Sequence, residues 1–162
     1  VAASAIATAI FILYHRKMVV ANNTLLLAIS GLGGFLGAQL DLIPAFILLA
    51  LLSVYDFIAV FGTKHMVTLA KEGSKQLPLL FSIPVGERRM GLGTGDLAIP
   101  IVFTAAVART SIQSGILTAV TGSIGLATLF YYTTNKENVT LPALPPIAIG
   151  LTIGYLTSLV FL

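Results

Sequence analysis

Six apolar segments, separated by shorter polar stretches, divide the chain. They cover approximately residues 1–14, 24–40, 42–62, 91–108, 114–132 and 141–162. Lipid offers no hydrogen-bond partners to the backbone, so segments of this kind are expected to be helices. The pattern therefore predicts an all-α polytopic membrane protein with six transmembrane helices in a single domain, 1–162. The first segment is shorter than the roughly 20 residues that span a bilayer, and we expect it to be the remainder of a longer helix.

Small residues in two of these segments indicate close helix packing. Gly33, Gly34 and Gly37 lie in the second segment, and the fifth contains Gly115, Gly122 and Gly125. Small side chains allow helix backbones in membranes to approach one another. Both segments are therefore predicted to pack tightly against neighbouring helices.

Composition supports the membrane assignment and excludes several functions. Hydrophobic residues make up 57% of the chain and charged residues only 9%, and there is no cysteine to form a disulfide, a thiolate metal site or a nucleophile. His15 and His65 do not have the spacing of metal ligands, so neither a metal nor a cofactor is expected. The net charge of +3 is explained by membrane topology, and no nucleic-acid partner is predicted.

The cations are distributed unequally between the two sides of the predicted membrane domain. If the segments alternate in direction, the loops 15–23, 63–90 and 133–140 lie on one side. These loops contain eight of the nine Lys and Arg residues, and Arg109 alone lies on the other side. The excess of cations predicts that the three loops, including the long polar stretch 63–90, are cytoplasmic.

Two acids lie deep inside apolar segments, where an ionisable side chain is costly and usually functional. Asp56 is about six residues before the end of its segment, and Asp96 is about five residues after the start of its own. At about 1.5 Å per residue, both carboxylates are expected roughly 8 to 9 Å below the cytoplasmic boundary. Equal depth on helices joined by one loop predicts that they meet.

The residues around Asp96 favour an irregular backbone. Gly93 and Gly95 allow close approach and unusual dihedral angles. Pro100 has no N–H to donate to the Asp96 carbonyl four residues earlier. Irregular backbone in a membrane must be buried in protein or face water, which predicts a water-filled cavity beside Asp96. The alternative is that these residues only kink the helix and that each aspartate bonds to a neighbouring hydroxyl or amide.

Two adjacent carboxylates do not both ionise readily, so one is expected to hold a proton near neutral pH. The charged carboxylate can then take a proton from water while the neutral one donates to a carbonyl oxygen. A transporter that uses intramembrane acids is a competing interpretation, but it predicts two related halves, and the sequence shows no convincing repeat. A purely structural membrane subunit gives no reason for the two acids.

Three short motifs, in this order on apolar segments, resemble the YD, GxGD and PAL motifs of the presenilin and signal-peptide-peptidase family. They are Tyr55-Asp56, Gly93-Thr94-Gly95-Asp96 and Pro142-Ala143-Leu144. The resemblance covers nearly the whole chain and is closest to archaeal presenilin homologues. Prepilin-type peptidases also have a GxGD motif, but the first and third motifs argue against that alternative.

The resemblance implies an intramembrane aspartyl protease with a nine-helix fold, of which the six segments match helices four to nine. The N-terminal part of that fold would be missing from this sequence. It implies that Asp56 and Asp96 are catalytic and that the other motif residues contact an extended substrate. Those residues are Tyr55, Gly93, Thr94, Gly95, Pro142, Ala143 and Leu144.

The resemblance also bears on specificity and partners. Thr94 stands where presenilins usually have leucine, so the resemblance does not extend to cleavage preference. The apolar stretch 79–85 corresponds to a loop that can be cut autocatalytically and can pair with substrate as a strand. Transmembrane-helix proteins are the implied substrates. A homo-oligomer is compatible with the sequence, and no accessory subunit is required by it.

Overall fold

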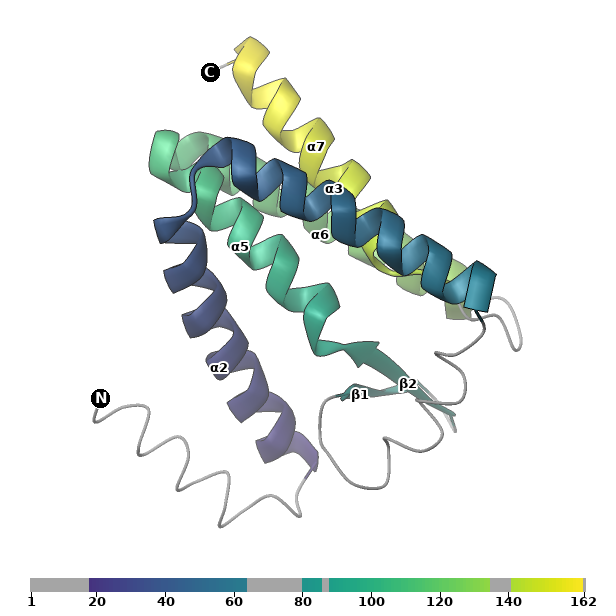
Figure 1. Cartoon of the computed structure of the whole chain (residues 1–162). Helices are drawn as coiled ribbons and strands as arrows, with labels where there is room; N and C mark the ends of the chain where they lie inside the picture. The colour runs from purple at the N-terminus through teal and green to yellow at the C-terminus, as the bar shows by residue number, and fades with distance from the viewer. Residues whose placement is uncertain (1–17, 64–79, 86–87, 135–140, 162) are drawn as a thin grey trace.

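The computed structural model describes residues 18–63, 80–85, 88–134 and 141–161 (Figure 1). The first predicted segment, 1–14, lies outside the described residues. The elements in chain order are α2 (Met18–Gln39), α3 (Leu42–Ile58), the π-helical turn η1 (Ala59–Thr63), β1 (Leu80–Val85), β2 (Arg88–Gly93), α5 (Thr94–Thr110), α6 (Ile112–Thr134) and α7 (Leu144–Phe161).

The remaining five predicted segments are helical, with shifted ends. Helix α2 begins at Met18 and continues through Asn22 and Asn23, which the sequence places in a loop. Polar residues of this kind mark a membrane boundary, whereas the helix itself continues beyond it. Within the described residues, three helices are long and apolar enough to cross a membrane, at Leu42–Phe61, Ile112–Thr133 and Leu144–Phe161.

A β-hairpin lies within the predicted long loop, so the all-α prediction is incomplete. Strands β1 and β2 pair antiparallel, with Leu80 opposite Gly93 and Val85 opposite Arg88. Residues 81–85 alternate between apolar and other residues, which is the period of a strand. The hairpin also corrects the start of the fourth segment, because residues 91–93 belong to β2 and α5 begins only at Thr94.

Glycines bring the helices together as predicted. A Cβ at Gly37 of α2 would collide with the Val102 carbonyl oxygen of α5, and one at Gly33 would lie 3.0 Å from Ile101 Cγ2. On α6, a Cβ at Gly125 would lie 2.7 Å from the Pro146 carbonyl oxygen of α7. Gly34 faces open space and has no such role.

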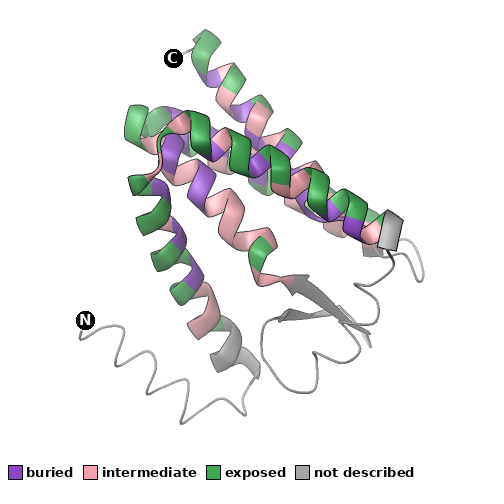
Figure 2. Ribbon diagram, in the orientation of Figure 1, coloured by how far each residue is buried: buried purple, intermediate pink, exposed green. Residues whose placement is uncertain are grey.

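The core lies where α3, α5 and α7 converge. Its buried residues are Ala45, Leu49, Phe103, Ala106, Val107, Ile147, Ala148 and Leu151. Phe46 packs edge-on against Phe103, with ring centroids 5.3 Å apart. Exposed positions are concentrated on the outer sides of the helices (Figure 2), and many of them are apolar, as expected for helices surrounded by lipid.

Candidate active site

Asp56 continues the buried stripe of α3. Ala45, Leu49, Asp56 and Ala59 are the buried positions of this helix and its π-helical extension, and their spacing places them on one helical face. Ala45 and Leu49 belong to the core. Asp56 therefore points in the same direction as the core residues, and only 7% of it is exposed.

Asp96 has the equivalent position on α5. Phe103 and Val107 are core residues of α5, and Asp96 precedes them by seven and eleven residues, which places all three on one face. Asp96 is partly buried in the first turn of the helix. Its side chain therefore extends the same apolar stripe toward the hairpin.

The two carboxylates come together at the hairpin end of the core. Asp56 lies seven residues after the core residue Leu49, and Asp96 lies seven residues before the core residue Phe103. Helix α3 runs toward the end of the molecule that contains the hairpin, and α5 runs away from it (Figure 1). Equal rise along opposed helices brings both acids to one level, where they interact electrostatically.

The start of α7 supplies a hydrogen bond to Asp56. The Leu144 backbone N–H donates to Asp56 Oδ2 at 3.0 Å, across 88 residues of sequence. Leu144 is the first residue of α7, where N–H groups have no partner within the helix. Pro145 and Pro146 follow and have no N–H to offer. Leu144 is therefore the first donor of this helix terminus, and it holds one oxygen of the Asp56 carboxylate.

Gly93 gives the Asp96 carboxylate room against the backbone. A Cβ at Gly93 would lie 3.0 Å from Asp96 Oδ2, and the backbone N–H of Gly93 interacts with that carboxylate. Gly93 is both the last residue of β2 and the N-cap of α5. The strand-to-helix junction thus positions Asp96, and a side chain at Gly93 would crowd its carboxylate.

A π-helical turn begins at Ala59, three residues after Asp56, and was not predicted from the sequence. The Ala59 N–H donates to the backbone carbonyls of both Asp56 and Tyr55, where α3 widens into η1. Single π-helical turns occur frequently at functional sites. Gly62 lies within this turn, but nothing in the apolar pattern distinguishes a π turn from continued α-helix.

The other predicted site residues separate into two groups. Pro142, Ala143 and Leu144 are buried, and Leu144 bonds Asp56, whereas Thr94 is partly buried next to Gly93. Tyr55 is 66% exposed because it lies one position away from Asp56 on the helix, outside the buried stripe. Gly95 is also exposed, and a Cβ added there would meet no atom within 4 Å. The structure does not bring Tyr55 and Gly95 to the carboxylates.

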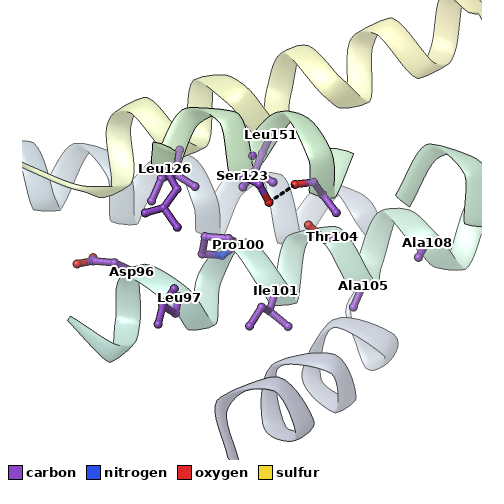
Figure 3. A pocket seen from close by; sticks show the side chains of 13 residues that line it. Asp96, Leu97, Pro100, Ile101, Thr104, Ala105, Ala108, Ser123, Leu126 and Leu151 are labelled. Atoms are coloured by element: carbon purple, nitrogen blue, oxygen red, sulfur yellow. Dashed lines mark hydrogen bonds between the residues drawn. The ribbon is translucent and has the colours of Figure 1, made fainter. Parts of the chain in front are cut away.

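A cavity of about 350 Å³ extends from Asp96 between α5, α6 and α7 (Figure 3). Pro100 interrupts the hydrogen bonding of α5 beside it. The walls of the cavity are mostly apolar. Among the residues that line it, those with polar side chains are Asp96, Thr104 and Ser123. A cavity beside Asp96 is thus present, but its apolar walls differ from those of the water-filled cavity that the sequence predicts.

Comparison with known proteins identifies relatives of this chain. A family model described as signal-peptide peptidase, presenilin aspartyl protease matches residues 1–90. The signal peptide peptidases of Mus musculus and Homo sapiens are each 37% identical over 104 residues, which is 60% of this chain and 28% of each relative. The chain therefore spans little more than a quarter of the length of these curated relatives.

One solved structure is similar over most of the chain. It is that of a presenilin family intramembrane aspartate protease, with a TM-score of 0.67 and 27% sequence identity. The similarity covers 94% of this chain and 56% of the other. The arrangement of α2 to α7 therefore resembles slightly more than half of a presenilin-family protease.

Proposed function

The chain belongs to the family of signal-peptide peptidases and presenilin aspartyl proteases, and we propose that it hydrolyses peptide bonds of transmembrane helices with Asp56 and Asp96. One observation carries the proposal. Asp56 and Asp96 each lie seven residues from a core residue on opposed helices, at the same end of the core, and the Leu144 N–H holds Asp56 from a third helix. The comparisons do not favour a transporter or a prepilin-type peptidase.

The two carboxylates act as a unit on one water molecule. The charged carboxylate removes a proton from water as the oxygen bonds to the scissile carbonyl carbon, and the protonated carboxylate donates to the carbonyl oxygen. The tetrahedral intermediate collapses when the C–N bond breaks and the amine takes a proton from the dyad. Water and peptide balance as one carboxylic acid and one amine, and no acyl-enzyme forms.

The substrate must unwind before this reaction, because a helical peptide bond is shielded by its own turn. Its freed N–H and C=O groups then need partners within the membrane. The hairpin of β1 and β2 has outer strand edges, and β2 leads through Gly93 directly into the turn that contains Asp96. A substrate strand that adds to the hairpin would therefore arrive beside the carboxylates.

In this proposal the remaining motif residues contact the substrate at different distances from the dyad. Thr94 and Gly93, at the junction of β2 and α5, contact the extended substrate on one side, and Pro142 to Leu144 contact it on the other. Tyr55 and Gly95 contact substrate from the exposed surface of α3 and α5. The segments 15–23, 63–90 and 133–140 lie on the cytoplasmic side, and cleavage occurs near that side of the membrane.

The test uses the protein reconstituted in lipid vesicles with a reporter transmembrane peptide. Asp56→Asn and Asp96→Asn preserve side-chain shape, and each is expected to lower the cleavage rate by at least about 100-fold, because each removes half of the acid–base pair. Asp41→Asn is the matched control, since Asp41 is exposed and pairs with Arg109 Nη1 at 3.5 Å. Cleavage that survives both substitutions would refute the proposal, and ion flux without proteolysis would favour a transporter.

A further inference from the structure

The cavity beside Asp96 is separate from the contact between the two carboxylates. Asp96 lies at one end of it, but within the described residues its lining comes from α5, α6 and α7 and includes no residue of α3. Asp56 and the Leu144 N–H therefore do not face it. The proposed peptide chemistry leaves this space unused.

The lining of the cavity follows α5 over several turns. Along α5 its lining extends from Asp96 to Ala108 (Figure 3), which corresponds to about 18 Å at 1.5 Å per residue. Ala119 and Gly122 of α6 form part of the opposite wall. Small side chains line both walls of this channel, and the extent of its lining along α5 suits a linear molecule better than a folded or cyclic one.

The walls favour an apolar occupant. Ser123 donates its hydroxyl to the Ala119 carbonyl oxygen at 2.8 Å, so it offers no free donor. Apolar cavities of about 150 Å³ stay dry and bind apolar molecules, and this one has about 350 Å³. Water has few partners along most of its length.

The cavity is continuous with the surface of α6 that faces lipid. Helix α6 is a candidate membrane span, and Ser123, which lines the cavity, is itself exposed. Val120 and Ile124 beside it are 51% and 59% exposed. A molecule within the bilayer can therefore enter from the side without crossing water.

We propose that this cavity binds one acyl chain of a membrane lipid, which lies along α5 between Ala108 and Asp96. The chain contacts Leu97 and Pro100, which also line the cavity. Both residues lie within the first two turns of α5, so the lipid packs against the part of the helix that positions Asp96. The occupant is a structural lipid of the catalytic helix.

Photolabelling tests this assignment without depending on protease activity. The protein is reconstituted in phosphatidylcholine vesicles in which one acyl chain has a diazirine, irradiated, and mapped by peptide mass spectrometry. Adducts are expected on Thr104, Ala105 and Ala119, which line the cavity and are not exposed. Adducts confined to the outward-facing residues of α3 and α6 would overturn the proposal.

Cavity-filling variants provide the second measurement. Ala119→Phe fills the channel from α6 and Thr104→Leu fills it from α5, and each is expected to reduce cavity adducts about tenfold, because several buried methylene contacts are lost. Val120→Phe places the same ring one position away, on the exposed side of α6, and is expected to leave them unchanged. Undiminished labelling in a folded cavity variant would refute the assignment. Thermal unfolding identifies a variant that has misfolded. If one variant misfolds, the labelling of the other variant and the adduct map of the wild-type protein test the assignment.

Discussion

Replacing Leu144 by proline isolates the hydrogen bond between α7 and Asp56. Proline lacks the N–H that donates to Asp56 Oδ2 at 3.0 Å. It is well tolerated at the first position of a helix, where that N–H has no partner within the helix. Ala143 lies outside the helix, so the restriction that proline places on the preceding residue does not break a helical turn. The substitution therefore removes one donor and leaves α7 in place.

The expected magnitude follows from the kind of bond that is lost. A hydrogen bond to a charged group contributes about 1.5 to 3 kcal/mol. If this bond is needed to hold the carboxylate in its reactive position, kcat falls about 10- to 150-fold. The Leu144 side chain is only 5% exposed, so its loss affects stability as well. Leu144→Ala is the matched control, because it removes the side chain and keeps the N–H.

The assay compares both variants in vesicles with a reporter transmembrane peptide at saturating concentration. Leu144→Pro is expected to cleave about 10- to 150-fold more slowly than Leu144→Ala, with similar thermal unfolding temperatures. The Asp56→Asn variant gives the background rate. If the two variants differ by less than about threefold in kcat, equivalent to about 0.7 kcal/mol, the N–H does not position Asp56 and the reasoning is wrong.

Three further predictions concern packing, the far end of the helices and specificity. Gly37→Ala should lower stability by about 1 to 3 kcal/mol in thermal unfolding, because its Cβ meets the backbone of α5; Gly34→Ala, which faces open space, should change it by no more than about 0.5 kcal/mol, and equal effects would contradict the packing model. Arg109→Ala should lower the free energy of unfolding by less than about 1 kcal/mol, and by less still in high salt, because Arg109 donates to the Leu40 carbonyl at 3.1 Å on an exposed surface. A larger loss of stability in thermal unfolding would indicate a structural role for this contact. Thr94→Leu should shift the cleavage positions measured by mass spectrometry, and an unchanged product pattern would exclude Thr94 from substrate contact.

The apolar pattern was sufficient to identify the helices and the level of the two acids. The bilayer excludes charged side chains and backbone groups without hydrogen-bond partners. Both constraints act on each segment separately, so they can be recognised from short stretches of sequence. Asp56 and Asp96 could therefore be placed near one end of their helices by counting residues. The glycines of α2 and α6 also predicted close packing, because small side chains have few other uses on such helices.

The tertiary structure decided which faces meet. Helix α3 is apolar on nearly all sides, so its pattern does not reveal which side is buried. Only its packing against α5 and α7 turns Asp56 inward and leaves Tyr55 exposed. The hydrogen bond from Leu144 to Asp56 joins residues 88 positions apart. The strand β1 is likewise defined by its pairing with β2. In a membrane, sequence determines the depth of a residue along its helix, whereas the rotation of that helix depends on its neighbours.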